Sequence, residues 1–187
     1  GGEAYPGDAV TRYVESLGTR YGIGLNAMTG HDRTVYMMSL PLDVPKVEET
    51  ALRIMHDWLV GLKLDSAAVE RERGIVKEEI RAYEQGDPFY TMKVGVGRHA
   101  RSLPIGTLQD IDRLSPTRLR VFYRKWYTPE LATLIVVGDV SAGETELLLR
   151  QIFGYIPGQS TPRPEETELS YAPGFTLTAL TDTLLRT

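Results

Sequence analysis

Two short strand-like segments followed by long amphipathic helices restrict the fold of this chain more than any other feature. Residues 24–29 and 34–40 each suit a strand, and the polar residues 30–33 between them suit a turn. The second segment is apolar on both faces, as expected of a strand inside a sheet. The segment 45–62 then carries one apolar stripe at helical spacing, and Asp65 suits the N-cap of a second long helix. This order predicts an α+β fold in which helices pack on one side of an antiparallel sheet.

Further elements are expected on both sides of this unit. Residues 6–17 have the apolar spacing of a short helix, and Gly18 suits its left-handed end. The very apolar residues 132–138 predict a strand. Two helix starts follow from capping patterns, Ser115 before Pro116 and Ser141 with Glu144. The helix after Pro116 is expected to point four side chains inward: Leu119, Phe122, Tyr123 and Trp126.

Composition excludes several classes of function. The net charge is −4 with acidic and basic residues interspersed, so a nucleic-acid partner is not expected. No apolar run approaches the roughly 20 residues of a membrane-spanning helix. Cysteine is absent, which excludes disulfides, thiolate metal sites and a cysteine nucleophile.

Glu72 and Glu79 are two helical turns apart, so their carboxylates lie on one face of the second long helix. Taken alone, the densely charged segment 70–81 is typical of a solvated helix face with ion pairs. Only a wider sequence pattern gives the two glutamates another interpretation.

Several sequence blocks, in the same order and spacing, resemble the pitrilysin/insulinase (inverzincin) family of zinc metallopeptidases, in particular its bacterial two-domain members. Residues 72–79 resemble the E-R-x-x-V-x-x-E motif, and residues 24–36 resemble the strand pair N-A-x-T and D-x-T-x-Y. Residues 104–106, 122–129 and 136–139 match later landmarks. The resemblance covers roughly residues 5–157 and implies a pitrilysin-like half-domain of a peptidase.

The resemblance also implies a chemistry. Family members hold zinc through the two histidines of H-x-x-E-H and a later glutamate, while the glutamate of the motif activates the metal-bound water. Carried over, the metal ligand is Glu79, and Glu72 is a carboxylate that orients the ligands. Asn26, Ala27 and Thr29 match the edge strand on which a substrate peptide lies.

The motif H-x-x-E-H does not occur in this sequence. In the family it lies shortly before an element that matches residues 2–6, so we expect the chain to be truncated at its N-terminus. The chain itself is then expected to bind no zinc and to be inactive, although the parent protein is a zinc endopeptidase. The alternative is a non-catalytic family member, a partner or structural subunit that binds polypeptides without cleaving them.

The resemblance also predicts a domain division. Residues 1–156 form a partial N-terminal peptidase domain, 157–173 a proline-rich linker, and 174–187 the first strand of the next domain. The expected partners are peptide substrates and the missing second half of the peptidase, with self-association through the exposed edges of residues 24–40. The resemblance favours the periplasm, with the cytoplasm as the alternative.

A metal site of another kind would need the histidines. His31 falls in the turn, His56 borders the apolar stripe, and His99 lies beside two arginines that would repel a cation. The sequence therefore does not favour a site built from these three residues.

Overall fold

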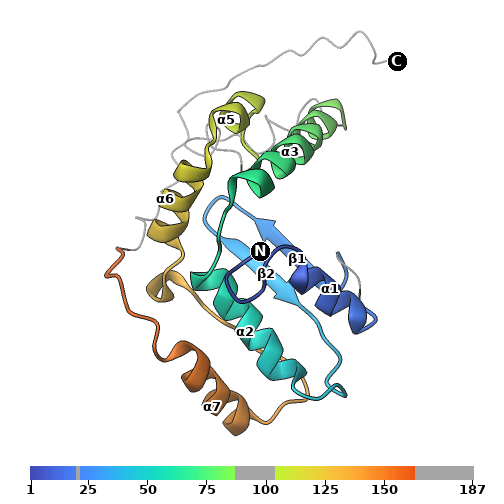
Figure 1. The fold of residues 1–187 in the computed structure, drawn as a ribbon, viewed down its shortest axis with the longest axis vertical. Helices are drawn as coiled ribbons and strands as arrows, with labels where there is room; N and C mark the ends of the chain where they lie inside the picture. Colours follow the sequence, from blue (N-terminus) through green and yellow to red (C-terminus); the bar gives the residue numbers. More distant parts are fainter. Residues whose placement is uncertain (20–21, 87–103, 163–187) are drawn as a thin grey trace, which may run out of the picture.

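The computed structural model describes residues 1–19, 22–86 and 104–162 (Figure 1). Its sheet has two antiparallel strands, β1 (Leu25–Thr29) and β2 (Thr34–Met38). Leu25 lies opposite Met38 and Thr29 lies opposite Thr34, which confirms the predicted strand pair and its turn.

Three helices belong to the N-terminal half: α1 (Ala9–Ser16), α2 (Val47–Val60) and α3 (Ser66–Gly86). Their ends follow from local chemistry. Gly18 has a φ of +76°, the left-handed conformation that ends α1 at low cost. The Asp65 carboxylate accepts a hydrogen bond of 2.9 Å from the Ala68 N–H, so it caps α3 as predicted.

The C-terminal half contains α5 (Leu108–Arg113), α6 (Pro116–Trp126), the 3-10 helix η2 (Pro129–Leu131) and α7 (Ala142–Phe153). The Ser115 hydroxyl accepts a bond of 3.3 Å from the Arg118 N–H, which confirms the predicted start of α6. Helix α5 was not predicted. It begins with a reciprocal capping box between Thr107 and Asp110, and this hydrogen bonding lowers the pKa of the Asp110 carboxyl.

The apolar core lies between the sheet and the first two helices. Its buried members are Val10 and Val14 of α1, Leu25 of β1 and Ile54 of α2. Figure 1 shows α2 lying along the sheet, with α7 beside it and α3, α5 and α6 at the other end of the molecule. The α+β prediction, with helices packed against an antiparallel sheet, is therefore confirmed.

Two sequence predictions in the C-terminal half were wrong. Residues 132–138 form no strand, and Ile135 and Val137 are 77% and 90% exposed. A strand requires a hydrogen-bonded neighbour, and no described segment pairs with these residues. Ser141 makes no side-chain cap to α7, so the predicted capping box is absent.

An aromatic cluster joins α6 to α2 and β2. The Tyr36 and Tyr127 hydroxyls are 2.7 Å apart, and the Tyr36 ring lies 5.4 Å from that of Trp58. The Tyr123 hydroxyl donates to the Trp58 carbonyl (2.9 Å) and accepts from the Leu62 N–H (3.2 Å). Burial and the Tyr127 hydroxyl raise the pKa of Tyr36, so its phenol is protonated at neutral pH.

The predicted inward position is therefore confirmed for Tyr123. Phe122 and Trp126 instead lie on the outer face of α6, where Phe122 is 56% exposed.

Candidate functional site

One face of helix α3 is fixed against α5 by polar side chains. The Arg73 guanidinium donates to the Ile111 carbonyl and, at 2.7 Å, to the Leu114 carbonyl. One turn further on, Lys77 pairs with Asp112, and this ion pair lowers the pKa of the Asp112 carboxyl. These contacts fix the rotation of α3, so they determine where its remaining side chains point.

Glu72 and Glu79 lie on the α3 face that does not pack on α5, and both are exposed. Within the described residues, neither carboxylate forms a hydrogen bond or an ion pair. Seven residues correspond to about 10 Å along a helix, so the two groups lie two turns apart on one stripe. The structure thus places the two predicted site residues on one open face.

Glu72 also lines a cavity of about 750 Å³ between the N-terminal segment and the start of α3. The N-terminal segment contributes Gly1, Gly7 and Asp8 to the lining, and further lining residues come from α3, α5 and α6. Glu79 lies beyond this cavity, further along the helix.

The donor set can be tested against zinc. Glu79 is a carboxylate, a type of ligand that zinc accepts, but a structural or catalytic site needs at least three protein ligands. Among residues 1–19, 22–86 and 104–162, no group of three or more His, Cys, Asp or Glu side chains could hold a metal ion. The described residues therefore do not form a zinc site by themselves.

The predicted substrate strand has one open edge. Ser39 N–H donates to Gly24 C=O and Gly30 N–H donates to Arg33 C=O. In this antiparallel register, the backbone N–H and C=O groups of the even-numbered residues of β1 point towards β2. Ala27 and Thr29 consequently turn their backbone N–H and C=O groups away from β2, where no described strand covers them.

Side chains at this edge are exposed. The Asn26 amide oxygen accepts a hydrogen bond of 2.9 Å from the Ala27 N–H, which points away from β2. The acceptor of this N–H is thus an exposed side chain that can move away. An extended peptide could take its place by strand addition.

Two of the three histidines lie in the part of the chain that the structure describes. His31 is exposed in the turn between the strands, and the His56 ring packs edge-on against Phe153 of α7 at 5.6 Å. His99 lies outside the described residues.

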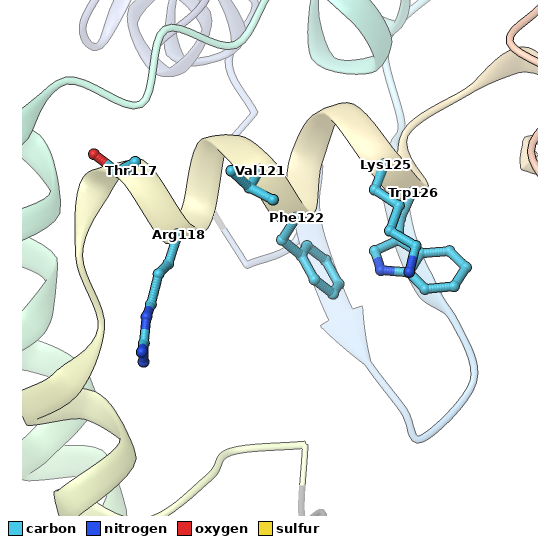
Figure 2. A pocket seen from close by; sticks show the side chains of 6 residues that line it. All are labelled: Thr117, Arg118, Val121, Phe122, Lys125 and Trp126. Carbon is cyan, nitrogen blue, oxygen red and sulfur yellow. The ribbon is translucent and has the colours of Figure 1, made fainter.

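A second hollow lies on the outer face of α6 (Figure 2). Phe122 and Trp126 project from this face, and the Lys125 ammonium is 4.5 Å from the centre of the Trp126 ring. The lining residues of this hollow include no carboxylate. It is a shallow apolar surface with a basic rim.

Two family models match the chain. The first, described as insulinase (peptidase family M16), matches residues 1–94, which is half of the sequence. The second, described as the peptidase M16 inactive domain, matches residues 113–178. The chain belongs to the insulinase family of peptidases.

A curated relative of this insulinase-family chain is the probable zinc protease PqqL of Escherichia coli. It is 32% identical over 165 residues, which are 84% of this chain and 17% of the relative. The chain therefore spans less than a fifth of the length of that zinc protease.

Solved structures of the family share the fold. The first half of the periplasmic protease PqqL from Escherichia coli superposes with a TM-score of 0.77 at 30% identity, covering 90% of this chain and 38% of that one. The ferredoxin protease FusC, solved in complex with Arabidopsis ferredoxin, has a TM-score of 0.81 at 25% identity over 92% of this chain and 20% of FusC. The insulinase-family chain thus has the fold of part of a peptidase half. None of its described helices combines the length and apolarity needed to cross a membrane.

Proposed function

We propose that this chain is part of a zinc-dependent endopeptidase in which Glu79 supplies one ligand to the metal. The observation that supports the proposal most directly is the open α3 face, on which Glu72 and Glu79 stand without partners among the described residues while most other charges of α3 are paired. Charged side chains on an exposed helix commonly form ion pairs. On α3 such pairs form beside the two glutamates but do not include them: Glu70 with Arg73, Lys77 with Asp112 and Glu78 with Arg81.

In the complete peptidase, the remaining ligands would come from residues outside this chain. The two histidines and the general base of an H-x-x-E-H motif would enter from the segment that precedes Gly1. Gly1 and Glu72 line the same cavity, so such a segment would arrive beside the α3 face. Bound zinc supplies an activated water for peptide hydrolysis. Glu72 orients the ligands from the cavity wall.

The substrate would be an extended peptide that pairs with β1. The outward backbone groups of Ala27 and Thr29 supply the hydrogen bonds, and Asn26 covers the Ala27 donor until a peptide replaces it. Main-chain pairing recognises an extended backbone rather than one sequence, which suits hydrolysis of unfolded polypeptides. In the absence of a peptide, the same edge would permit self-association. The relative PqqL is named as periplasmic, and we extend this location to the present protein.

The match of residues 113–178 to a family model described as inactive favours a second candidate. In this alternative, the complete protein binds polypeptides without cleaving them. It would lack the two histidines, and the β1 edge alone would bind the peptide. The two candidates make opposite predictions about hydrolysis.

The test compares the complete protein with the present chain. Purified with zinc, the complete protein should cleave an unstructured peptide, lose this activity to a chelator and regain it with zinc. The 187-residue chain should show no cleavage with or without zinc. Peptide binding without cleavage by the zinc-loaded complete protein would support the non-catalytic alternative, and cleavage by the chain alone would contradict both.

A further inference from the structure

A buried carboxylate on α2 holds the N-terminal segment. Asp57 is 4% exposed and accepts three consecutive backbone N–H groups. The Glu3 and Ala4 N–H groups donate to Oδ1 at 3.0 and 3.1 Å, and the Tyr5 N–H donates to Oδ2 at 3.1 Å. Successive N–H groups that converge on one anion form a stabilising nest, so this segment is organised around the Asp57 charge.

The contact leaves no room for larger residues. A Cβ on Gly2 would lie 1.9 Å from Asp57 Oδ2, and a Cβ on Gly61 would lie 2.2 Å from Oδ1. Both glycines therefore allow the backbone to approach the carboxylate closely. The requirement is steric rather than conformational, because neither has a positive φ.

The charge of Asp57 has no cationic partner in the described part of the chain. The acids in the ion pairs found there are Asp8, Glu49, Glu70, Glu78, Asp112 and Glu146. A buried carboxylate without a cation depends on its hydrogen bonds for stability. The three N–H groups are thus a necessary part of the fold at this point.

Backbone bonds extend the contact towards α3. Glu3 N–H donates to the Gly61 carbonyl at 2.9 Å, and Lys63 N–H donates to the Gly1 carbonyl at 3.3 Å. Gly2 and Leu62 form an antiparallel bridge between these bonds. The chain continues from Leu62 into α3 within four residues, so Gly1 is held at a fixed position relative to Glu72 across the cavity that both line.

We propose that Asp57 is a positioning residue that fixes the backbone of residues 1–5 and thereby the direction in which the preceding segment meets the α3 face. This inference rests on the proposed function, in which that preceding segment carries catalytic groups. Displacement of reacting groups by about 1 Å can cost about 100-fold in rate. A carboxylate far from the reacting atoms would therefore control catalysis through backbone geometry.

The test uses Asp57→Asn in the complete peptidase, with the exposed Asp43→Asn as the matched control. The introduced amide can accept at its single oxygen only, so some of the three N–H groups lose their acceptor. Amide exchange of residues 3–5 should accelerate about tenfold or more, while exchange in β1 should change less than about twofold. The kcat per folded molecule should fall by about 10- to 100-fold at nearly unchanged KM. Unchanged exchange at residues 3–5, or an unchanged kcat per folded molecule, would overturn the proposal.

Gly2→Ala tests the same contact from the other side and keeps the carboxylate. It should reproduce both effects, because its methyl group displaces the segment from Asp57. In an Asp57→Ala background, where the carboxylate is gone, Gly2→Ala should have a much smaller additional effect. Full additivity of the two changes would contradict the proposal. If the complete protein cleaves no peptide, the proposed function fails, and the exchange measurements alone decide the role of Asp57.

Discussion

The N-terminal and C-terminal parts of this molecule are held together by different forces. Up to α2, helices and sheet enclose an apolar core in which Ile54 is fully buried. After residue 104, the buried side chains of the described residues are Thr128 and Thr145, both polar. The later helices are attached by polar contacts, such as Arg73 to α5 and the Tyr123 hydroxyl to α2, and by single ring contacts, such as that of His56 with Phe153.

The two kinds of attachment distinguish a part of the molecule with its own apolar core from a part without one. Burial of apolar side chains stabilises a core through a non-directional effect. Individual hydrogen bonds instead fix the position of an element, and they do so without removing much apolar surface from water. The apolar residues 134–137 are exposed in the part that has no core of its own.

The largest expected effect is Ile54→Ala in the chain. Deletion of a fully buried side chain should destabilise the fold by about 2–5 kcal/mol, because transfer and cavity costs add. Val137→Ala, at a position that is 90% exposed, is the control and should change stability by less than about 0.5 kcal/mol. Urea unfolding measures both. Equal effects would show that the two parts are not organised as described.

The next effect is Tyr123→Phe. The hydroxyl bridges the Trp58 carbonyl and the Leu62 N–H, so its removal should cost about 1–3 kcal/mol by leaving partly buried groups without partners. Tyr155→Phe, at an 88% exposed position, should leave the unfolding midpoint unchanged. A midpoint for Tyr123→Phe equal to that of the wild type would show that water replaces these bonds.

A smaller and local effect is expected for Arg73→Ala. Loss of the bonds to the Ile111 and Leu114 carbonyls should accelerate amide exchange in α5 and leave exchange in β1 and β2 unchanged. Arg150→Ala, which removes an exposed pair with Glu146, is the control. Faster exchange throughout the sheet would mean that α5 and the core form one cooperative unit.

The smallest effect is the response of the α3–α5 contact to pH. The pKa of Asp112 is lowered by Lys77, so its contribution to stability is complete above the ordinary aspartate value of 3.8 and is lost as the pH falls through the lowered pKa. Asp112→Asn should therefore reduce stability at neutral pH and have no effect at strongly acidic pH. An equal effect of the substitution at both pH values would contradict an electrostatic contact.

Local patterns predicted most of the helices and strands, and failed where partners are distant in sequence. The strand pair, the ends of α1 and α3 and the shared face of Glu72 and Glu79 all follow from neighbours within a few residues. The prediction for 132–138 was wrong because apolar character does not supply a pairing strand. Asp57 was missed because its partners lie 52 to 54 residues away, although the glycines at 2 and 61 are visible in the sequence.

The role of Glu79 as a zinc ligand is tested most directly by the zinc content of the complete protein. Glu79→Gln keeps the size of the side chain and removes the charge, and the adjacent Glu78→Gln is the matched control, since Glu78 pairs with Arg81 on another face of α3. After dialysis against buffered zinc, we predict about one zinc per molecule for wild type and Glu78→Gln, and a large loss for Glu79→Gln. Equal zinc content in all three proteins would contradict the assignment of Glu79 as a ligand.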